Sequence, residues 1–210
     1  MSEIYKKYFP DLDEDRLRKL ELFKEVCLEW NEKINVISRK DTDEFEINHV
    51  LHSLAIAKVF PFKKGSKILD FGTGGGFPGL PLAIFLPDVQ FTLVDSIGKK
   101  MKVVDACVQR LGLKNVETRV GRVEDIDKFF DFITCRAVGR VEKIVPWVRK
   151  KLIKNGNNAF PNGFIFLKGG DVAEELSQIE IPYKRIRISD YFEEPFFETK
   201  EIVYLSKHHN

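Results

Sequence analysis

The sequence predicts an α/β protein with a mostly parallel, seven-stranded sheet, helices on both faces of the sheet and a helical cap at the N-terminus. Two observations support this expectation. Before Pro61, apolar residues recur at steps of three and four, which is the period of an amphipathic helix. From Lys67 onward, short apolar runs alternate with helical segments, a pattern typical of a parallel sheet flanked by helices. We therefore expect a cap over residues 1–62 and a core over residues 63–210, which together form one compact unit.

The predicted cap contains two amphipathic helices. Asp11 and Glu14 have the spacing of a capping box, and an apolar stripe follows them as far as Ile34. Asp41 and Glu44 form a second box of the same kind ahead of the next stripe. One face of each helix should therefore be buried against the core.

The predicted core contains seven strands with helices between the first five. The strands are expected at residues 67–71, 90–95, 115–120, 131–135, 163–168, 183–188 and 197–205. The helices are expected at residues 79–86, 98–111, 141–153 and 171–179. Because no helix separates the last two strands, they should form a hairpin that closes the parallel sheet with one reversed strand. This is the Rossmann-like fold of methyltransferases that use S-adenosylmethionine.

Composition excludes several classes of protein. No apolar run approaches the ~20 residues that span a bilayer, and the N-terminus has no signal-peptide core. Cys27, Cys107 and Cys135 lie far apart, and His49 and His52 have no further ligands at a metal spacing. We therefore expect a cytoplasmic monomer with no metal, no membrane segment and no disulfide framework. We interpret the two histidines as helix-surface or cap-interface residues.

The charge distribution is less decisive than the composition. The formal net charge is only +2, which by itself does not predict nucleic-acid binding. Lysines and arginines nevertheless cluster at residues 99–102, 149–154 and 184–187. Such clusters either neutralise phosphates or form an ordinary solvated face.

A glycine-rich turn follows the first predicted strand. In an open parallel sheet the ligand lies outside the C-terminal ends of the strands, so the cofactor should bind at this turn. Gly74, Gly76 and Gly79 match the dinucleotide pattern GxGxxG, but such a match alone is weak evidence. Asp70 ahead of Gly72, Gly74 and Gly76 is the stronger match, because an acid placed two residues before alternating glycines is typical of S-adenosylmethionine binders.

The next two predicted strands end at further candidate binding residues. Asp95 is expected to accept hydrogen bonds from both ribose hydroxyls, each worth about 1.5–3 kcal/mol. NAD sites use the same contact, and an N-cap for the helix at Gly98 is the alternative role. Beyond the third strand, Val123 and Glu124 are expected to lie along the adenine, with a plain surface carboxylate as the alternative for Glu124.

Three more candidates stand at the ends of the fourth and fifth strands. Cys135 as a thiolate would permit methylation at C5 of cytosine, although a buried structural cysteine is the commoner case. Arg136 is expected to clamp the methionyl carboxylate of the cofactor or a base oxygen, with a structural ion pair as the alternative. Lys168 is a candidate contact for substrate phosphate. The acid or amide, two prolines and aromatic that usually accompany amino-nitrogen methylation do not follow the fourth strand.

Several motifs in order identify a resemblance to a known family. The chain contains DFGTGGGFPGLPLAI, then VDS, GRVED, CRAV and LKGG, and its N-terminal EWNEKINVISRKD and NHVLHSL look like that family's cap. With these motifs the chain resembles the glucose-inhibited division protein B family, the bacterial guanine-N7 methyltransferases of 16S rRNA in the small ribosomal subunit. The resemblance implies S-adenosyl-L-methionine as cofactor and contacts to it at Gly72, Phe77, Val123, Glu124 and Arg136.

The resemblance also implies a mechanism in which Arg136 orients the reactants. N7 of guanine carries a free lone pair and loses no proton, so no general base is expected. The chain departs from the family pattern at His52, where an acid is usual, and at Lys200 and Glu201, where an Arg-His pair is usual. It also has Cys135 where serine or threonine is usual. The alternatives are a methyltransferase for C5 of cytosine, one for a small molecule, and a nucleoside-binding module without catalysis.

Overall fold

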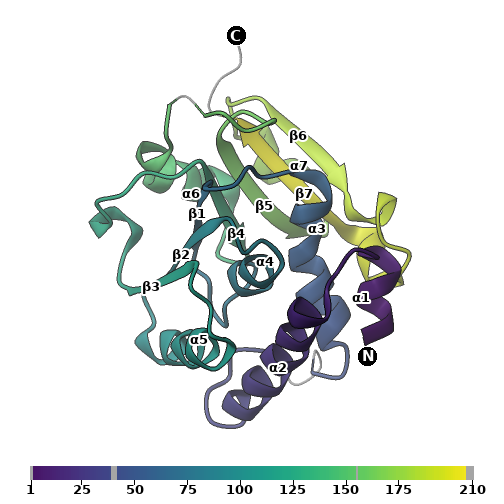
Figure 1. Ribbon diagram of the computed structural model, residues 1–210. Helices are drawn as coiled ribbons and strands as arrows, with labels where there is room; N and C mark the ends of the chain where they lie inside the picture. Colours follow the sequence, from purple (N-terminus) through teal and green to yellow (C-terminus); the bar gives the residue numbers. More distant parts are fainter. Residues whose placement is uncertain (1, 39–41, 155, 207–210) are drawn as a thin grey trace.

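The protein is built around a seven-stranded sheet with the strand order β3-β2-β1-β4-β5-β7-β6 (Figure 1). The computed structural model describes residues 2–38, 42–154 and 156–206. The strands are β1 (Lys67–Phe71), β2 (Gln90–Asp95), β3 (Val116–Val120), β4 (Phe132–Arg136), β5 (Gly163–Gly169), β6 (Tyr183–Arg187) and β7 (Lys200–Ser206). Strands β1 to β5 run parallel, whereas β7 is antiparallel to both β5 and β6. The predicted sheet with one reversed strand is confirmed.

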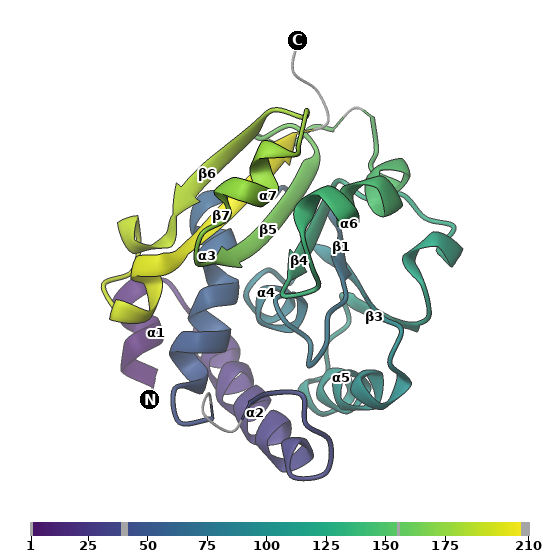
Figure 2. The same cartoon turned by 180° about the vertical axis from the view of Figure 1, so that it is seen from behind.

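Helices cover both faces of this sheet. On one face lie α1 (Ser2–Tyr8), α2 (Glu14–Asn31), α3 (His52–Val59), α4 (Gly79–Phe85) and α5 (Gly98–Leu111), whose buried residues share one hydrophobic cluster. On the other face lie α6 (Val141–Val148) and α7 (Ala173–Ser177), in a second cluster with β4 and β5 (Figure 2). The two-faced arrangement follows from the parallel strands, which are apolar on both sides. None of the described helices is both long and apolar enough to cross a bilayer.

Helix α2 begins and ends at polar side chains. The Asp13 carboxylate accepts a hydrogen bond from the Arg16 backbone N–H at 2.8 Å, so Asp13 is the N-cap and the prediction of Asp11 was wrong. At the other end, the Asn31 side chain accepts from the backbone N–H groups of Val36 and Ile37, each at 2.9 Å. The Asn31 amide oxygen thus pairs with backbone N–H groups of the turn that follows the helix. The helix therefore ends at Asn31, before the predicted end at Ile34.

The second cap helix has an irregular first part. A π-helical segment, η2 (Glu46–Leu51), runs directly into α3, and the Ser53 hydroxyl donates to the His49 carbonyl at 2.7 Å. Asp41, the predicted cap residue, lies outside the described residues.

Helix α1 was not predicted. Its Tyr8 hydroxyl lies 2.7 Å from a Glu194 carboxylate oxygen, and this contact ties α1 to the C-terminal part of the chain.

Other boundaries differ from prediction at the C-terminal side of the chain. The predicted helix 141–153 becomes α6 and a separate 3-10 turn, η4 (Arg149–Lys151). Two further 3-10 turns, η5 (Ile188–Asp190) and η6 (Pro195–Thr199), separate β6 from β7. Strand β7 therefore begins later than predicted, because η6 turns Phe197 into the core instead of extending it.

Cap and core meet through aromatic rings beside the glycine turn. The Phe77 ring centroid, from the core, lies 5.3 Å from that of Phe23 and 5.9 Å from that of Phe45, both from the cap. The Sγ atoms of Cys27 in α2 and Cys107 in α5 lie 3.9 Å apart in the same layer. The cap thus packs directly against the turn expected to bind the cofactor. The division at residues 62 and 63 stays a prediction.

Candidate functional site

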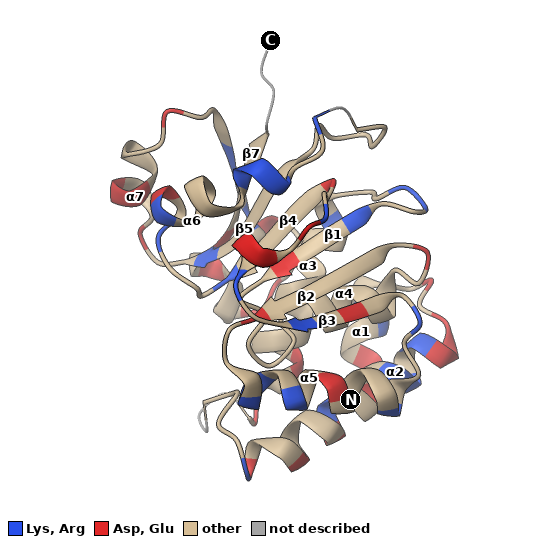
Figure 3. Cartoon of the chain, turned by 90° about the vertical axis from the view of Figure 1, so that its left-hand side faces the viewer, with Lys and Arg blue, Asp and Glu red and all other residues tan. Residues whose placement is uncertain are grey.

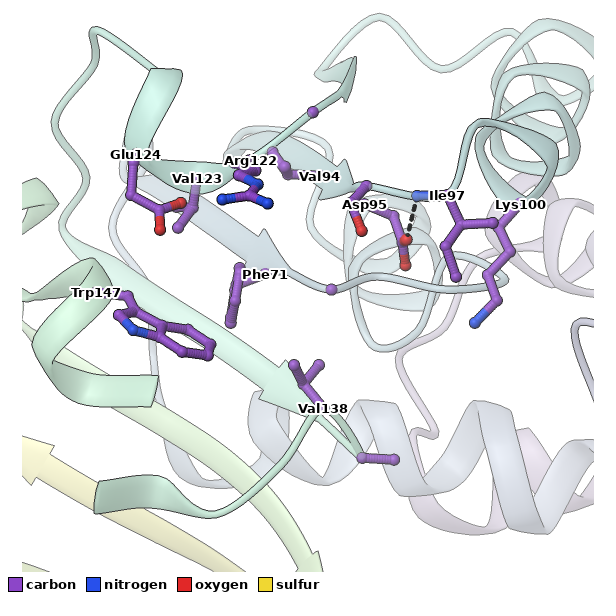
Figure 4. A pocket seen from close by; sticks show the side chains of 14 residues that line it. Phe71, Val94, Asp95, Ile97, Lys100, Arg122, Val123, Glu124, Val138 and Trp147 are labelled. Carbon is purple, nitrogen blue, oxygen red and sulfur yellow. Dashed lines mark hydrogen bonds between the residues drawn. The ribbon is translucent and has the colours of Figure 1, made fainter. Parts of the chain in front are cut away.

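A cavity of about 560 Å³ opens at the C-terminal ends of β1 to β4 (Figure 4). This edge includes the switch point between β1 and β4, where open parallel sheets bind their ligands. Of the predicted binding residues, Gly72, Asp95, Val123 and Glu124 line the cavity. The tertiary structure therefore brings residues from three strand ends together at one site.

The glycine turn is fixed by a carboxylate beneath it. Asp70 is fully buried, and one of its carboxylate oxygens accepts from the Thr73 hydroxyl at 2.5 Å and the Gly79 N–H at 2.9 Å. The other oxygen accepts from the Thr134 hydroxyl at 3.0 Å. Burial raises the pKa of Asp70 to about 6, although the three hydrogen bonds act in the opposite direction. Asp70 thus joins β1, the turn, the start of α4 and β4.

Gly72 lines the cavity at the end of β1, at a position that only glycine fits. Its φ of +65° lies in the left-handed region, and a Cβ there would lie 2.3 Å from Cγ2 of Val138. Any larger residue would therefore displace Val138 in the loop after β4, which also lines the cavity. Gly74 does not line the cavity, but its N–H donates to the Asp95 carboxylate at 2.9 Å. The cofactor contact of Gly74 stays a prediction.

Asp95 links the turns after β1 and β2. Its second carboxylate oxygen accepts from the Ile97 N–H at 2.8 Å (Figure 4). No side chain caps α5, whose N-cap residue is Ile97, so Asp95 does not have the alternative N-cap role. An ionised carboxylate has about four acceptor positions, and the two backbone contacts leave capacity for a ligand hydroxyl.

Val123 and Glu124 lie in a single 3-10 turn after β3, η3 (Val123–Asp125). Val123 is buried, whereas Glu124 is exposed and reaches the cavity. The Lys151 ammonium donates to the carbonyls of Glu124 and Ile126 and so holds this turn in place. This corner of the site therefore combines an apolar wall with one acidic side chain.

Phe77 and Arg136 lie beside the cavity, on the side of the cap. Phe77 is buried, and the Arg136 guanidinium lies 4.6 Å from the centroid of its ring. Arg136 also donates to the Asn48 carbonyl at 3.2 Å and lies 3.0 Å from Nδ1 of His49. Neither side chain is part of the cavity lining, so the cofactor contacts of both residues stay predictions. His49 and His52 are buried, so the helix-surface interpretation was wrong, and the contact of His49 with Phe77 agrees with the cap-interface interpretation.

Lys168 lies at the end of β5, outside the cavity. Its ammonium pairs with Glu175 of α7 at 2.9 Å and donates to the Gly139 carbonyl at 2.8 Å. Through these contacts it anchors the loop after β4, in which Ala137 adopts an unusual positive φ of 56°. Contact of Lys168 with substrate phosphate stays a prediction.

The Cys135 thiol is embedded in β4. Only 2% of the residue is exposed, and burial together with the nearby Asp70 charge raises its pKa to about 12. The thiolate is the nucleophilic form of cysteine, so this environment disfavours the attack on cytosine that the alternative requires.

Sequence reasoning missed several residues that line the cavity. They include Phe71, Ile97, Lys100, Arg122, Val138 and Trp147. Trp147 comes from α6, is 52% exposed, and meets Phe71 edge-on with ring centroids 6.4 Å apart. Figure 4 shows Trp147 and Phe71 on one side of the cavity and Glu124 and Val123 on the other. Phe71, Ile97 and Arg122 stand one or two positions from predicted site residues, and this proximity along the chain was the signal that could have identified them.

The matches to known proteins agree with this geometry. The GidB family model, described as rRNA small subunit methyltransferase G, matches residues 16–200. The chain belongs to this family. It is 52% identical over 203 residues to ribosomal RNA small subunit methyltransferase G of Christiangramia forsetii, covering 97% of this chain and 96% of that protein. The protein of the same name from Cytophaga hutchinsonii is 46% identical, with coverage of 97% and 98%.

Solved structures of other methyltransferases share the fold of this family member. A SAM dependent methyltransferase from Aquifex aeolicus superimposes with a TM-score of 0.57 and 17% identity, covering 80% of this chain and 98% of that chain. Precorrin-6y C5,15-methyltransferase from Geobacter metallireducens gives a TM-score of 0.53 at 12% identity, with coverage of 83% and 92%. The predicted family and the predicted Rossmann-like methyltransferase fold are both confirmed, and the chain is a methyltransferase enzyme.

Proposed function

We propose that this protein transfers the methyl group of S-adenosylmethionine to N7 of a guanine in 16S rRNA of the small ribosomal subunit. The family model and relatives named ribosomal RNA small subunit methyltransferase G support small-subunit rRNA as the substrate. The observation that carries the proposal is the cavity that Gly72, Asp95, Val123 and Glu124 frame within the matched residues. The choice of guanine N7 comes from the resemblance in the glycine segment.

The residues of the cavity fit S-adenosylmethionine. In this proposal Asp95 accepts from the ribose hydroxyls, and Val123 and Glu124 lie along the adenine. The methionyl end lies toward Gly72 and toward Arg136 beside the cap. A cavity of about 560 Å³ is within the range of small-molecule sites, which are mostly apolar with a few well-placed polar groups.

The chemistry requires orientation rather than proton transfer. The sulfonium of S-adenosylmethionine supplies an activated methyl group, and N7 of guanine attacks with a lone pair that carries no proton. The chain must then hold the donor in one orientation, keep the base out of its stack and exclude water. Arg136 orients the donor in this proposal by clamping its carboxylate.

The decisive test uses small ribosomal subunits that lack the modification. Incubation with a methyl-labelled donor should label 16S rRNA at one guanine and release S-adenosylhomocysteine in equal amount. Naked rRNA in a parallel reaction shows whether the assembled particle is needed. Label in a cytosine or in a small molecule, or donor binding without release of product, would contradict the proposal.

Replacing Cys135 with serine should leave the rate of methyl transfer within about threefold of the parent value. The thiol is buried in β4 and holds its proton, so the proposed reaction does not use it. Initial rates on small ribosomal subunits measure the effect, with Cys107→Ser as a second buried cysteine for comparison. A loss of activity confined to the Cys135 variant would instead favour the cytosine C5 mechanism.

Binding of S-adenosylhomocysteine should change the fluorescence of Trp147. The chain has two tryptophans, so the Trp30→Phe variant reports on Trp147 alone. Adenine placed along Val123 and Glu124 would face the Trp147 indole, and stacking on an aromatic ring contributes about 1–3 kcal/mol per base. Trp147→Phe should abolish the signal, and Trp147→Ala should weaken binding about fivefold or more. An unchanged spectrum in Trp30→Phe at saturating ligand would place the adenine elsewhere.

Basic residues near the cavity mouth are expected to contact the rRNA. Lys100 lines the cavity, and Lys99 and Lys102 share the first part of α5 with it. Figure 3 shows basic and acidic residues interspersed along the ribbon on the side of the molecule that carries β3. We therefore propose that phosphate contacts are concentrated at this lysine cluster.

A monomeric state and a cytoplasmic location remain part of the proposal.

A further inference from the structure

We propose that His49 is the positioning residue for Arg136, whose guanidinium it holds in the direction needed to clamp the methionyl carboxylate of the cofactor. This inference rests on the proposed function, and it assigns a role to a cap residue that does not line the cavity. It also explains why a helix from the first sixty residues packs beside a site built from the strand ends of the core.

The contact between the two side chains has a defined polarity. Nδ1 of His49 lies 3.0 Å from Nη2 of Arg136. A guanidinium has only N–H donors, so Nδ1 must accept, and His49 is neutral with its proton on Nε2. Nη1 of Arg136 donates to the Asn48 carbonyl at 3.2 Å. Two consecutive cap residues therefore hold two nitrogens of one guanidinium.

Ring packing restricts the remaining motion of the guanidinium. Arg136 lies 4.6 Å above the Phe77 ring, and the His49 ring packs on the same phenylalanine with centroids 4.9 Å apart and planes at 35°. Because a guanidinium is planar and rigid, fixing two of its nitrogens and one of its faces fixes the direction of the whole group. Phe77 in turn packs on Phe23 and Phe45 of the cap, so the platform itself is held.

The backbone is irregular on both sides of this contact. His49 lies within the π-helical segment η2, and short π-helical stretches within helices occur frequently at functional sites. Ala137, directly after Arg136, has a φ of 56°, which is uncommon for a residue other than glycine, and it lines the cavity. The contact between His49 and Arg136 thus joins two locally unusual segments at the edge of the cofactor cavity.

The neighbouring His52 provides a matched control. It lies in the same continuous helix, is buried to a similar extent, and packs on Phe196 and Phe197 instead of on Phe77. Its Nε2 has no hydrogen-bond partner among the described residues. Substitution of His52 therefore measures the cost of altering a buried histidine in this helix that makes no ring contact with Phe77 and does not hydrogen-bond the Arg136 guanidinium, although the Arg136 charge and the Asn48 backbone lie near it.

The experiment compares His49→Leu, His49→Gln and His52→Leu in the full chain. For each variant, calorimetry gives the Kd of S-adenosylhomocysteine, initial rates on small ribosomal subunits give kcat and KM, and thermal unfolding gives Tm. His49→Leu should raise the Kd about tenfold or more, the effect of losing one hydrogen bond to a charged group. His49→Gln keeps a side-chain acceptor and should stay within about threefold of the parent. His52→Leu should stay within about twofold, even where its Tm falls as far as that of His49→Leu.

Coupling to Arg136 gives the second criterion. Because His49 acts through the guanidinium, His49→Leu should have no further effect on the Kd in an Arg136→Ala background. Equal values for His49→Leu and His52→Leu, failure of His49→Gln to restore binding, or additive effects with Arg136→Ala would each overturn the inference. A raised KM for subunits with an unchanged cofactor Kd would overturn it too. If the parent binds cofactor in this His49-dependent way but methylates no rRNA, the proposed function fails and the positioning role stands.

Discussion

Replacing Arg136 with alanine should lower methyl transfer to small ribosomal subunits about 100-fold or more while leaving the fold intact. The guanidinium is held by Asn48, His49 and Phe77 at the edge of the cavity, so its loss leaves the methionyl end of the donor without a fixed partner. Misplacement of reacting atoms by about 1 Å can cost about 10²-fold in rate. Arg136→Lys should be intermediate in activity, because lysine keeps the charge and loses the planar fork.

The rate should be measured with labelled donor at saturating subunits, beside circular dichroism and thermal unfolding. Arg110→Ala is a suitable control, since Arg110 is half exposed at the end of α5 and forms a surface ion pair with Glu29. The control should retain full activity. Near-normal turnover by Arg136→Ala would exclude the orienting role, and unfolding of that variant would show that the residue is structural.

Replacing Asp70 with alanine should lower the free energy of unfolding by about 3 kcal/mol or more. The buried carboxylate accepts from Thr73, Gly79 and Thr134, and a buried donor left without an acceptor costs about 1–3 kcal/mol. Asp70→Asn should be much milder. Its amide oxygen can accept from Thr73 and Gly79, while its NH₂ can donate to the Thr134 hydroxyl, which in turn lies 3.4 Å from the Leu69 carbonyl.

The Asp70→Asn variant should also change how stability depends on pH. Burial raises the pKa of Asp70 from 3.8 to about 6, so between these values the folded state binds a proton that the unfolded state has released. The contribution of the Asp70 carboxyl group to the free energy of unfolding is therefore present in full below about pH 4 and is lost as the pH rises through about 6. Asp70→Asn removes that loss, so its stability relative to the parent should increase across this interval. Urea unfolding at several pH values tests this, and a difference independent of pH would contradict it.

The sequence alone was sufficient for the sheet and for part of the site. Short apolar runs that alternate with helical segments are typical of a parallel sheet with helices on both faces, and the missing helix between the last two runs indicated one reversed strand. The ends of such strands meet at one edge. This is why the amino-acid pattern alone predicts Gly72, Asp95, Val123 and Glu124 as neighbours.

Only the tertiary structure decided where the long side chains go. Arg136 and Phe77 turn toward the cap, Lys168 pairs with Glu175, and Trp147 reaches the cavity from α6. Backbone patterns fix which residue ends a strand. The direction of a long side chain depends instead on which other elements pack beside it, and those elements come from distant parts of the chain. The contact between His49 and Arg136 spans 87 positions, so no local pattern could have predicted it.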